Sequence, residues 1–62
     1  MCDLNSARVE EIASLDGVSL AHAYELLLWR PYADWLAVEA VPGFDETSVK
    51  ALRKAGAVLV LP

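Results

Sequence analysis

One stretch of the sequence, residues 15–30, limits the fold more than any other. After Gly17 and Ser19 it continues into a segment, about Leu20–Trp29, that is apolar on nearly every side of a helix. Gly17 suits a left-handed residue just past a preceding helix, and Ser19 is a good N-cap for the next one. A helix with so few polar positions must lie centrally in the domain. The stretch therefore predicts two helices joined by a very short turn, with Val18 as an apolar plug at the bend.

Three shorter helical patterns accompany this central helix. Apolar spacing predicts a first helix at about Arg8–Leu15, and Pro31 must end the second helix because it disfavours helical geometry in the residue before it. A third helix is expected at about Trp35–Ala40 and a fourth at about Glu46–Ala55. The expected N-caps of the last two helices are Asp34 and Asp45. Gly56 then follows the fourth helix as its natural C-terminal glycine.

The chain also matches itself at an offset of 26 residues, which aligns Gly17 with Gly43. The other matched pairs are Val18 and Phe44, Ile12 and Val38, Leu15 and Val41, Ala23 and Val49, and Leu26 and Leu52. This internal repeat predicts two helical hairpins, one at about 8–30 and one at about 34–55, related by a pseudo-two-fold axis. We expect both glycines to have a positive φ, and the apolar residue after each to be buried between its flanking helices.

A family resemblance agrees with this repeat. Its motif consists of Leu15, Gly17 and Val18, followed at helical spacing by Ala23, Leu26 and Leu27. With this motif the chain resembles the helix-hairpin-helix family over about Asp3–Leu59. It is similar above all to the small tandem domains of competence-type DNA receptors and of the extrinsic U subunit of photosystem II. The resemblance implies one all-α, SAM-like domain over residues 1–62, built from four to five short helices.

The resemblance also implies a binding site. In the family, two glycine turns straddle the DNA minor groove, and the N–H groups at the helix N-termini hold backbone phosphates without reading sequence. The corresponding residues here are Gly17, Val18, Ser19, His22, Gly43, Phe44 and Asp45. This chain departs from the pattern, because Ser19 and Asp45 replace the second glycine of each turn, and His22 and Ser48 replace the basic residues. Carboxylates at Asp45 and Glu46, with Asp16 beside the first turn, oppose a phosphate.

Charge and composition leave two functions open. The net charge is −4, opposite in sign to a usual nucleic-acid binder. A candidate basic patch consists of Arg30, Lys50, Arg53 and Lys54; the simpler interpretation is that bases near a helix C-terminus complement its dipole. Apolar residues make up 56% of the chain, so some are expected on the surface as a contact for a partner. The chain is thus either a weak, sequence-independent binder of double-stranded DNA or a protein-docking module with degenerate acidic hairpins, and its apolar surface also allows a homo-oligomer.

Other classes of function lack a sequence signal. The chain has no glycine-rich nucleotide loop, no Ser/His/Asp set and no HExxH motif, so we expect no catalytic residue, no metal and no cofactor. A single cysteine, Cys2, excludes an internal disulfide and is expected to be a frayed terminal thiol. Apolar runs such as Leu26–Trp29 are far too short to span a membrane. Without a signal peptide, the protein is expected in the cytoplasm if these residues are the whole chain.

Several side chains have a functional and a structural interpretation. His22 is expected to be solvated on the outer side of the second helix, because one histidine is no metal site. Trp29, Tyr24 and Tyr32 could stack on bases, but their spacing favours positions in the core and at its rim. The apolar tail, residues 57–62, either packs back over the helices or docks on another chain.

Overall fold

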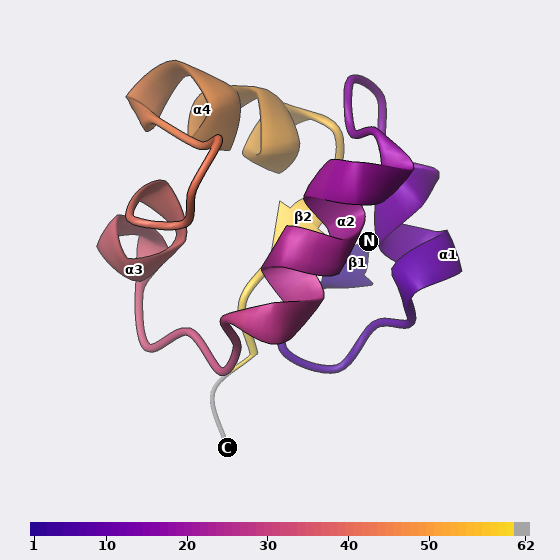
Figure 1. Ribbon diagram of the computed structural model, residues 1–62, viewed down its shortest axis with the longest axis horizontal. Helices are drawn as coiled ribbons and strands as arrows, with labels where there is room; N and C mark the ends of the chain where they lie inside the picture. Colours follow the sequence, from indigo (N-terminus) through magenta and orange to yellow (C-terminus); the bar gives the residue numbers. More distant parts are fainter. Residues whose placement is uncertain (61–62) are drawn as a thin grey trace.

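The structure is a computed structural model that describes residues 1–60. Its elements are β1 (Cys2–Asp3), α1 (Val9–Ala13), α2 (Leu20–Leu28), α3 (Trp35–Glu39), α4 (Glu46–Lys54) and β2 (Ala57–Val58). Four helices are paired in two, α1 with α2 and α3 with α4, and the small sheet lies behind α2 in the view of Figure 1. The described part of the chain is therefore a small, mostly helical domain. Each helix ends within two residues of its predicted bounds.

Side chains that cap the helices fix where three of them begin. The Ser19 hydroxyl accepts a hydrogen bond from the backbone N–H of His22, at 3.2 Å. The Asp34 carboxylate accepts from the N–H of Ala37 at 2.9 Å. Asp45 does the same for α4, and all three predicted N-caps are thus confirmed. The first helix has Arg8 at its N-cap, whose N–H donates to the Glu11 carboxylate at 3.2 Å.

The two glycine turns repeat each other in their hydrogen bonds as well as in sequence. Gly17 has φ +84° and Gly43 has φ +91°, which confirms the predicted left-handed conformation. In the first turn, the N–H of Val18 donates to the carbonyl of Leu15 at 3.1 Å; in the second, the N–H of Phe44 donates to that of Val41 at 3.0 Å. The offset between the two bonds is again 26 residues. The internal repeat therefore extends to the backbone of both turns.

The expectation of an all-α fold is wrong at the two ends of the described chain. There β1 and β2 form a parallel two-stranded sheet, in which Cys2 pairs with Ala57 and Asp3 with Val58. Cys2 is buried rather than frayed, and that burial raises the pKa of its thiol. Ala57 is buried too, so the tail packs back over the domain as one of the two expected alternatives has it. Residues 61–62 of the tail lie outside the described part.

Asn5 ties three distant segments together. Its side-chain oxygen accepts from the N–H of Tyr32 at 2.6 Å, while its amide nitrogen donates to the carbonyls of Tyr32 at 3.0 Å and Val60 at 3.3 Å. Tyr32 belongs to the core. Its hydroxyl donates to the carbonyl of Leu26 at 2.6 Å, and burial raises its pKa to about 12.

The core lies between the two helical pairs and the sheet. Its buried residues are Cys2, Leu4, Ala7, Ile12, Ala23, Leu26, Tyr32, Val38, Val41, Val49, Leu52 and Ala57. All the buried side chains described are apolar or aromatic, apart from the thiol and the bonded tyrosine hydroxyl. Within residues 1–60, no helix is both long enough and apolar enough to cross a bilayer.

Candidate functional site

The two glycine turns border one hollow of about 340 Å³, which opens to solvent. We call it the inter-turn hollow. It is lined by Asp16, Gly17, Val18, His22, Gly43, Phe44, Asp45, Thr47, Ser48, Ala51 and Leu52. Of the predicted hairpin residues, Ser19 alone is not part of this lining. Turns separated by 26 residues in sequence are therefore brought to one site, as the repeat predicts.

The apolar plugs, Val18 and Phe44, form part of the wall of this hollow. Both pack against the core but are only half-buried. The prediction that they are buried between their helices is therefore wrong in degree. The cause is the hollow itself: each plug has one side against the helices and another facing the opening. These side chains give the hollow an apolar wall between two acidic turns.

The turns differ in what lies over their glycines. A β-carbon added at Gly43 would lie 3.1 Å from Nε2 of His22, whereas one at Gly17 would meet no atom of the described residues within 4 Å. The His22 ring also contacts Phe44 edge-on, with ring centroids 5.4 Å apart. His22 is exposed as expected, but it reaches from α2 onto the second turn instead of standing alone in solvent. The second turn is thus partly covered and the first is open.

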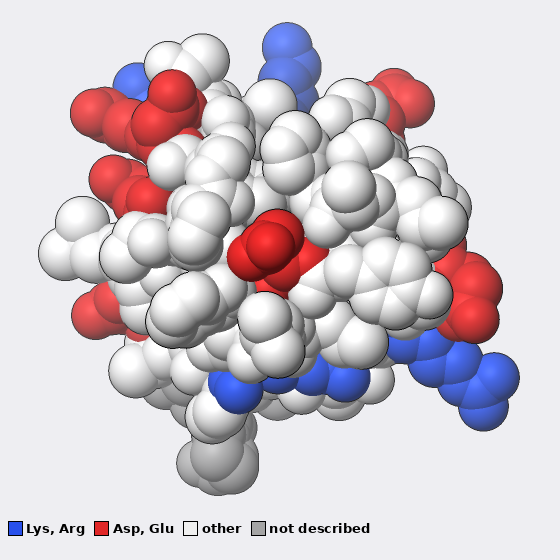
Figure 2. Space-filling view, in the orientation of Figure 1, with Lys and Arg blue, Asp and Glu red and all other residues white. Residues whose placement is uncertain are grey.

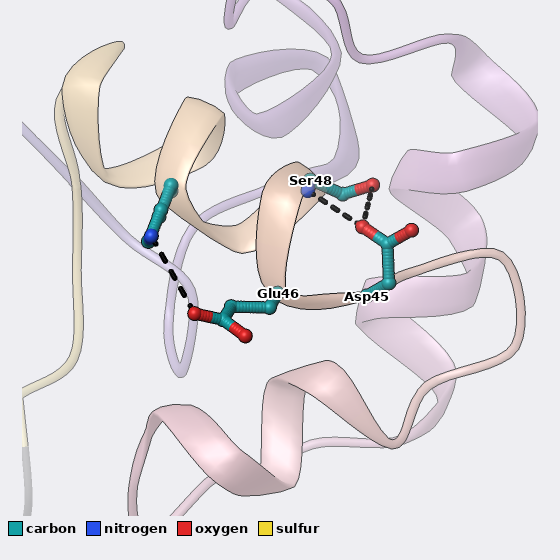
Figure 3. Close-up of polar contacts among 4 residues, drawn as sticks. Asp45, Glu46 and Ser48 are labelled. Atoms are coloured by element: carbon teal, nitrogen blue, oxygen red, sulfur yellow. Dashed lines mark hydrogen bonds and ion pairs between the residues drawn. The ribbon is translucent and has the colours of Figure 1, made fainter.

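The N-terminus of α4 is occupied by its own carboxylate. Figure 3 shows Asp45 turned back toward Ser48, whose N–H and hydroxyl both donate to one Asp45 oxygen, at 2.8 Å and 3.0 Å. These hydrogen bonds to Ser48 lower the pKa of Asp45, so the carboxylate stays ionised at neutral pH. The group that caps α4 therefore carries a negative charge at the place where an anion would bind.

Three of the four candidate basic residues contact different groups, and the fourth, Lys54, lies near Asp16 in the lining of a separate shallow pocket. Lys50 pairs with Glu46 at 3.4 Å, on the exposed side of α4. The Arg53 guanidinium lies over the ring of Trp35, 5.0 Å from its centroid. The side chain of Arg30 is half-buried and donates to the carbonyls of Leu4 and Ala7, at 3.3 Å and 2.7 Å. On the face in Figure 2, basic side chains lie at separate places around the edge.

The three aromatic candidates for base stacking divide into core and surface. Tyr32 is buried, whereas Tyr24 and Trp29 are exposed on α2 and beside its end. The indole N–H of Trp29 donates to the Glu25 carboxylate at 3.0 Å. This distribution agrees with the structural interpretation, in which such residues occupy the core and its rim.

The site has residues that turn chemistry alone does not reveal. Thr47, Ala51 and Leu52 line the hollow from α4, and their helical spacing beside Ser48 is the signal that places them on one face. Among residues 1–60, no three His, Cys, Asp or Glu side chains gather as a metal site would require. Comparison with protein-family models, with curated proteins and with solved structures finds no match to this chain.

Proposed function

We propose that this chain is a non-catalytic binding module of the tandem helix-hairpin-helix type, which docks on a protein instead of holding DNA. The proposal of a tandem module rests on the two turns. They share the same backbone hydrogen bonds, the same positive φ at glycine and the same 26-residue offset, and they border one hollow. Residues of both turns, including the two turn residues Gly17 and Val18 before α2 and the N-cap of α4, therefore contribute to one opening, which is suited to binding.

The observation that favours a protein partner is the Asp45 carboxylate at the N-terminus of α4. An ionised side chain there satisfies the N–H of Ser48 and repels a phosphate. Asp16 adds a second carboxylate to the same hollow, and the net charge of the chain is −4. An apolar wall beside two acidic residues instead matches a protein surface that carries a basic residue next to an apolar one.

Binding of the DNA backbone is the second candidate, and the first turn favours it. Gly17 is open to solvent on the side where a β-carbon would project, and Ser19 caps α2 without a charge. One turn of this kind supports at most weak, salt-sensitive binding, because Asp16 lies beside it and the second turn is capped by a carboxylate.

Titration of duplex DNA at about 50 mM and about 200 mM salt tests the two candidates, since phosphate contacts weaken steeply over this range. The parent is expected to bind weakly or not at all at the higher salt. The variant Asp45→Gly/Ser48→Lys rebuilds the family pattern at the second turn and raises the charge by two units. It is expected to bind more tightly, with a salt slope steeper by about two counter-ions if both changes act on phosphates.

A matched control separates the site from bulk charge. Asp34→Gly/Ala33→Lys also removes an aspartate N-cap and adds two charges, but at α3, outside the hollow lining. It is expected to gain less affinity than the hollow variant. Tight, salt-sensitive binding by the parent would establish the DNA candidate and reject the docking proposal. Equal gains by both variants, with melts showing that both are folded, would mean that the hollow is not where phosphate binds.

A further inference from the structure

Helix α2 is apolar on its outer side as well as on the side that faces the core. On the side of α2 that faces the core, Ala23 and Leu26 are fully buried. Leu20, Tyr24 and Leu28 recur every four residues, and their exposed fractions are 56%, 54% and 74%. We call these three residues, with the adjacent Trp29, the α2 stripe. Helix α2 lies in front of the sheet in Figure 1, and Figure 2, in the same orientation, shows mostly uncharged surface in that region, with one acidic group near the centre.

The geometry points to a second copy of this chain as the occupant of the α2 stripe. We propose that two copies pair through antiparallel α2 helices about a two-fold axis near Tyr24. The pattern is symmetric about that residue, so Leu20 of one copy would face Leu28 of the other. A two-fold interface requires this kind of self-complementary patch. The proposal concerns a different surface from the inter-turn hollow and does not depend on what binds there.

The area of the stripe fits a weak dimer. An aromatic side chain has a surface of roughly 150–250 Å², so the half-exposed Tyr24 and Trp29 each offer about 100 Å² for contact. With the two exposed leucines, the accessible apolar area of the stripe is about 350 Å² per copy. Two copies then bury about 700 Å² of apolar surface. A specific complex needs roughly 1,000 Å² in total, so the residues around the stripe have to supply the remainder of the contact. We therefore expect association at tens to hundreds of micromolar.

Charge gives this dimer a distinctive salt dependence. His22 and Glu25 are the ionisable residues of α2, apart from Tyr24, and the Glu25 carboxylate is bonded to the Trp29 indole. The stripe itself therefore carries no charge, while each copy has a net charge of −4. Screening the repulsion between two acidic copies favours association, so added salt should strengthen the dimer. Binding to DNA phosphates has the opposite dependence.

Sedimentation equilibrium from about 10 µM to about 1 mM, at about 50 mM and about 500 mM salt, tests the proposal. The parent is expected to shift from monomer to dimer across this range, at lower concentration in high salt. Leu28→Glu places a carboxylate in each half of the interface and should weaken the dimer at least tenfold. Leu36→Glu is the matched control: it is the same change at a leucine that is 71% exposed, bordering the groove between α3 and α4. This variant should associate like the parent.

Several outcomes would overturn the dimer. A parent that stays monomeric to about 1 mM at both salts would leave the stripe to a different protein. Equal weakening by Leu36→Glu and Leu28→Glu would place the contact elsewhere, and dissociation on adding salt would show that it is not apolar. Circular-dichroism melts establish that both variants are folded, which their exposed positions favour. Because Leu28 lies outside the lining of the inter-turn hollow, Leu28→Glu tests the dimer without changing the docking site, and the two proposals can fail separately.

Discussion

The two glycine turns have nearly the same backbone and different surroundings. In both, the N–H after the glycine returns to the carbonyl three residues earlier, and a side chain caps the next helix. The first turn is open and capped by an uncharged serine. The second is covered by the His22 ring and capped by an ionised aspartate. The comparison teaches that the cap and the covering of one turn can change while the backbone of the repeat is retained.

The helices that follow the turns differ in a similar way. Both α2 and α4 bury residues at equivalent positions, Ala23 with Leu26 and Val49 with Leu52. The outer side of α4 carries the Glu46–Lys50 pair, whereas the outer side of α2 is apolar. Equivalent inner faces maintain the fold, so the outer faces can vary. If the two hairpins have different roles, the first hairpin, which contains α2, is the one whose outer surface suits contact with a partner.

Valine at each glycine should give the largest losses of stability in the two turns. Both positions have positive φ, which a β-branched residue adopts at a cost of about 1–3 kcal/mol. Gly17→Val should lose about 2 kcal/mol, from strain alone. Gly43→Val should lose about 3 kcal/mol, because its side chain also has to displace the His22 ring. Urea unfolding of both variants measures the two losses.

The His22→Ala background isolates the contribution of that ring. There Gly43→Val should cost no more than Gly17→Val does in the parent, since only the backbone strain remains. An excess that persists without the imidazole would show that the second turn is strained for another reason. Equal losses at the two glycines in the parent would mean that the covering of the second turn has no energetic consequence.

The apolar plugs should give smaller losses, with a difference between the turns of the same sign. Phe44→Ala removes a half-buried ring together with its edge contact to His22, and is expected to cost about 2 kcal/mol, below the 3–5 kcal/mol of a fully buried phenylalanine. Val18→Ala removes two methyl groups from a half-buried position and should cost about 1 kcal/mol. Thermal melts followed by circular dichroism compare the two. A larger loss at Val18 than at Phe44 would reverse the assignment of which turn is better packed.

The sequence predicted the helical part of this fold well because its signals are local. Gly17 and Gly43 predict the turns, and the N-cap residues predict where the helices begin; these are Ser19, Asp34 and Asp45. Each depends on a few neighbouring residues and on backbone chemistry that any chain shares. The 26-residue repeat then brings the turns into correspondence, and this is why most hairpin residues were found in one hollow.

Long-range contacts explain what the sequence did not predict. Cys2 is buried because a two-residue strand pairs with another 55 positions later, and so short a strand leaves no periodic pattern. Asn5 contacts Tyr32 and Val60, partners that no local rule selects. The half-burial of Phe44 likewise depends on the hollow between two turns. Such features follow from how elements meet, which spacing within one element does not encode.

The caps should give the smallest difference, and it depends on pH. The hydrogen bonds from Ser48 lower the pKa of Asp45 below its usual value of 3.8. A carboxyl whose folded pKa is lowered stabilises the fold above its unfolded pKa, and this contribution is lost as the pH falls through the folded pKa. Ser19 does not titrate, so the cap of α2 is insensitive to acid. The two turns should therefore differ in acid stability.

Exchanging the chemistry of the caps tests this difference. Asp45→Asn keeps a capping oxygen without the charge, so it should be less stable than the parent at pH 7 and approach it near pH 2. Ser19→Asp should transfer an acid-sensitive contribution to the first turn. Unfolding midpoints measured at pH 7, 4 and 2 follow both changes. Asp3 also has a lowered pKa, mainly because it accepts a hydrogen bond from the Ser6 hydroxyl. It is unchanged in every variant, so it contributes the same acid dependence of stability to each. If Asp45→Asn keeps a constant offset from the parent at all three values, the charge on the cap of α4 does not contribute to folding, and the second turn differs from the first only in what covers it.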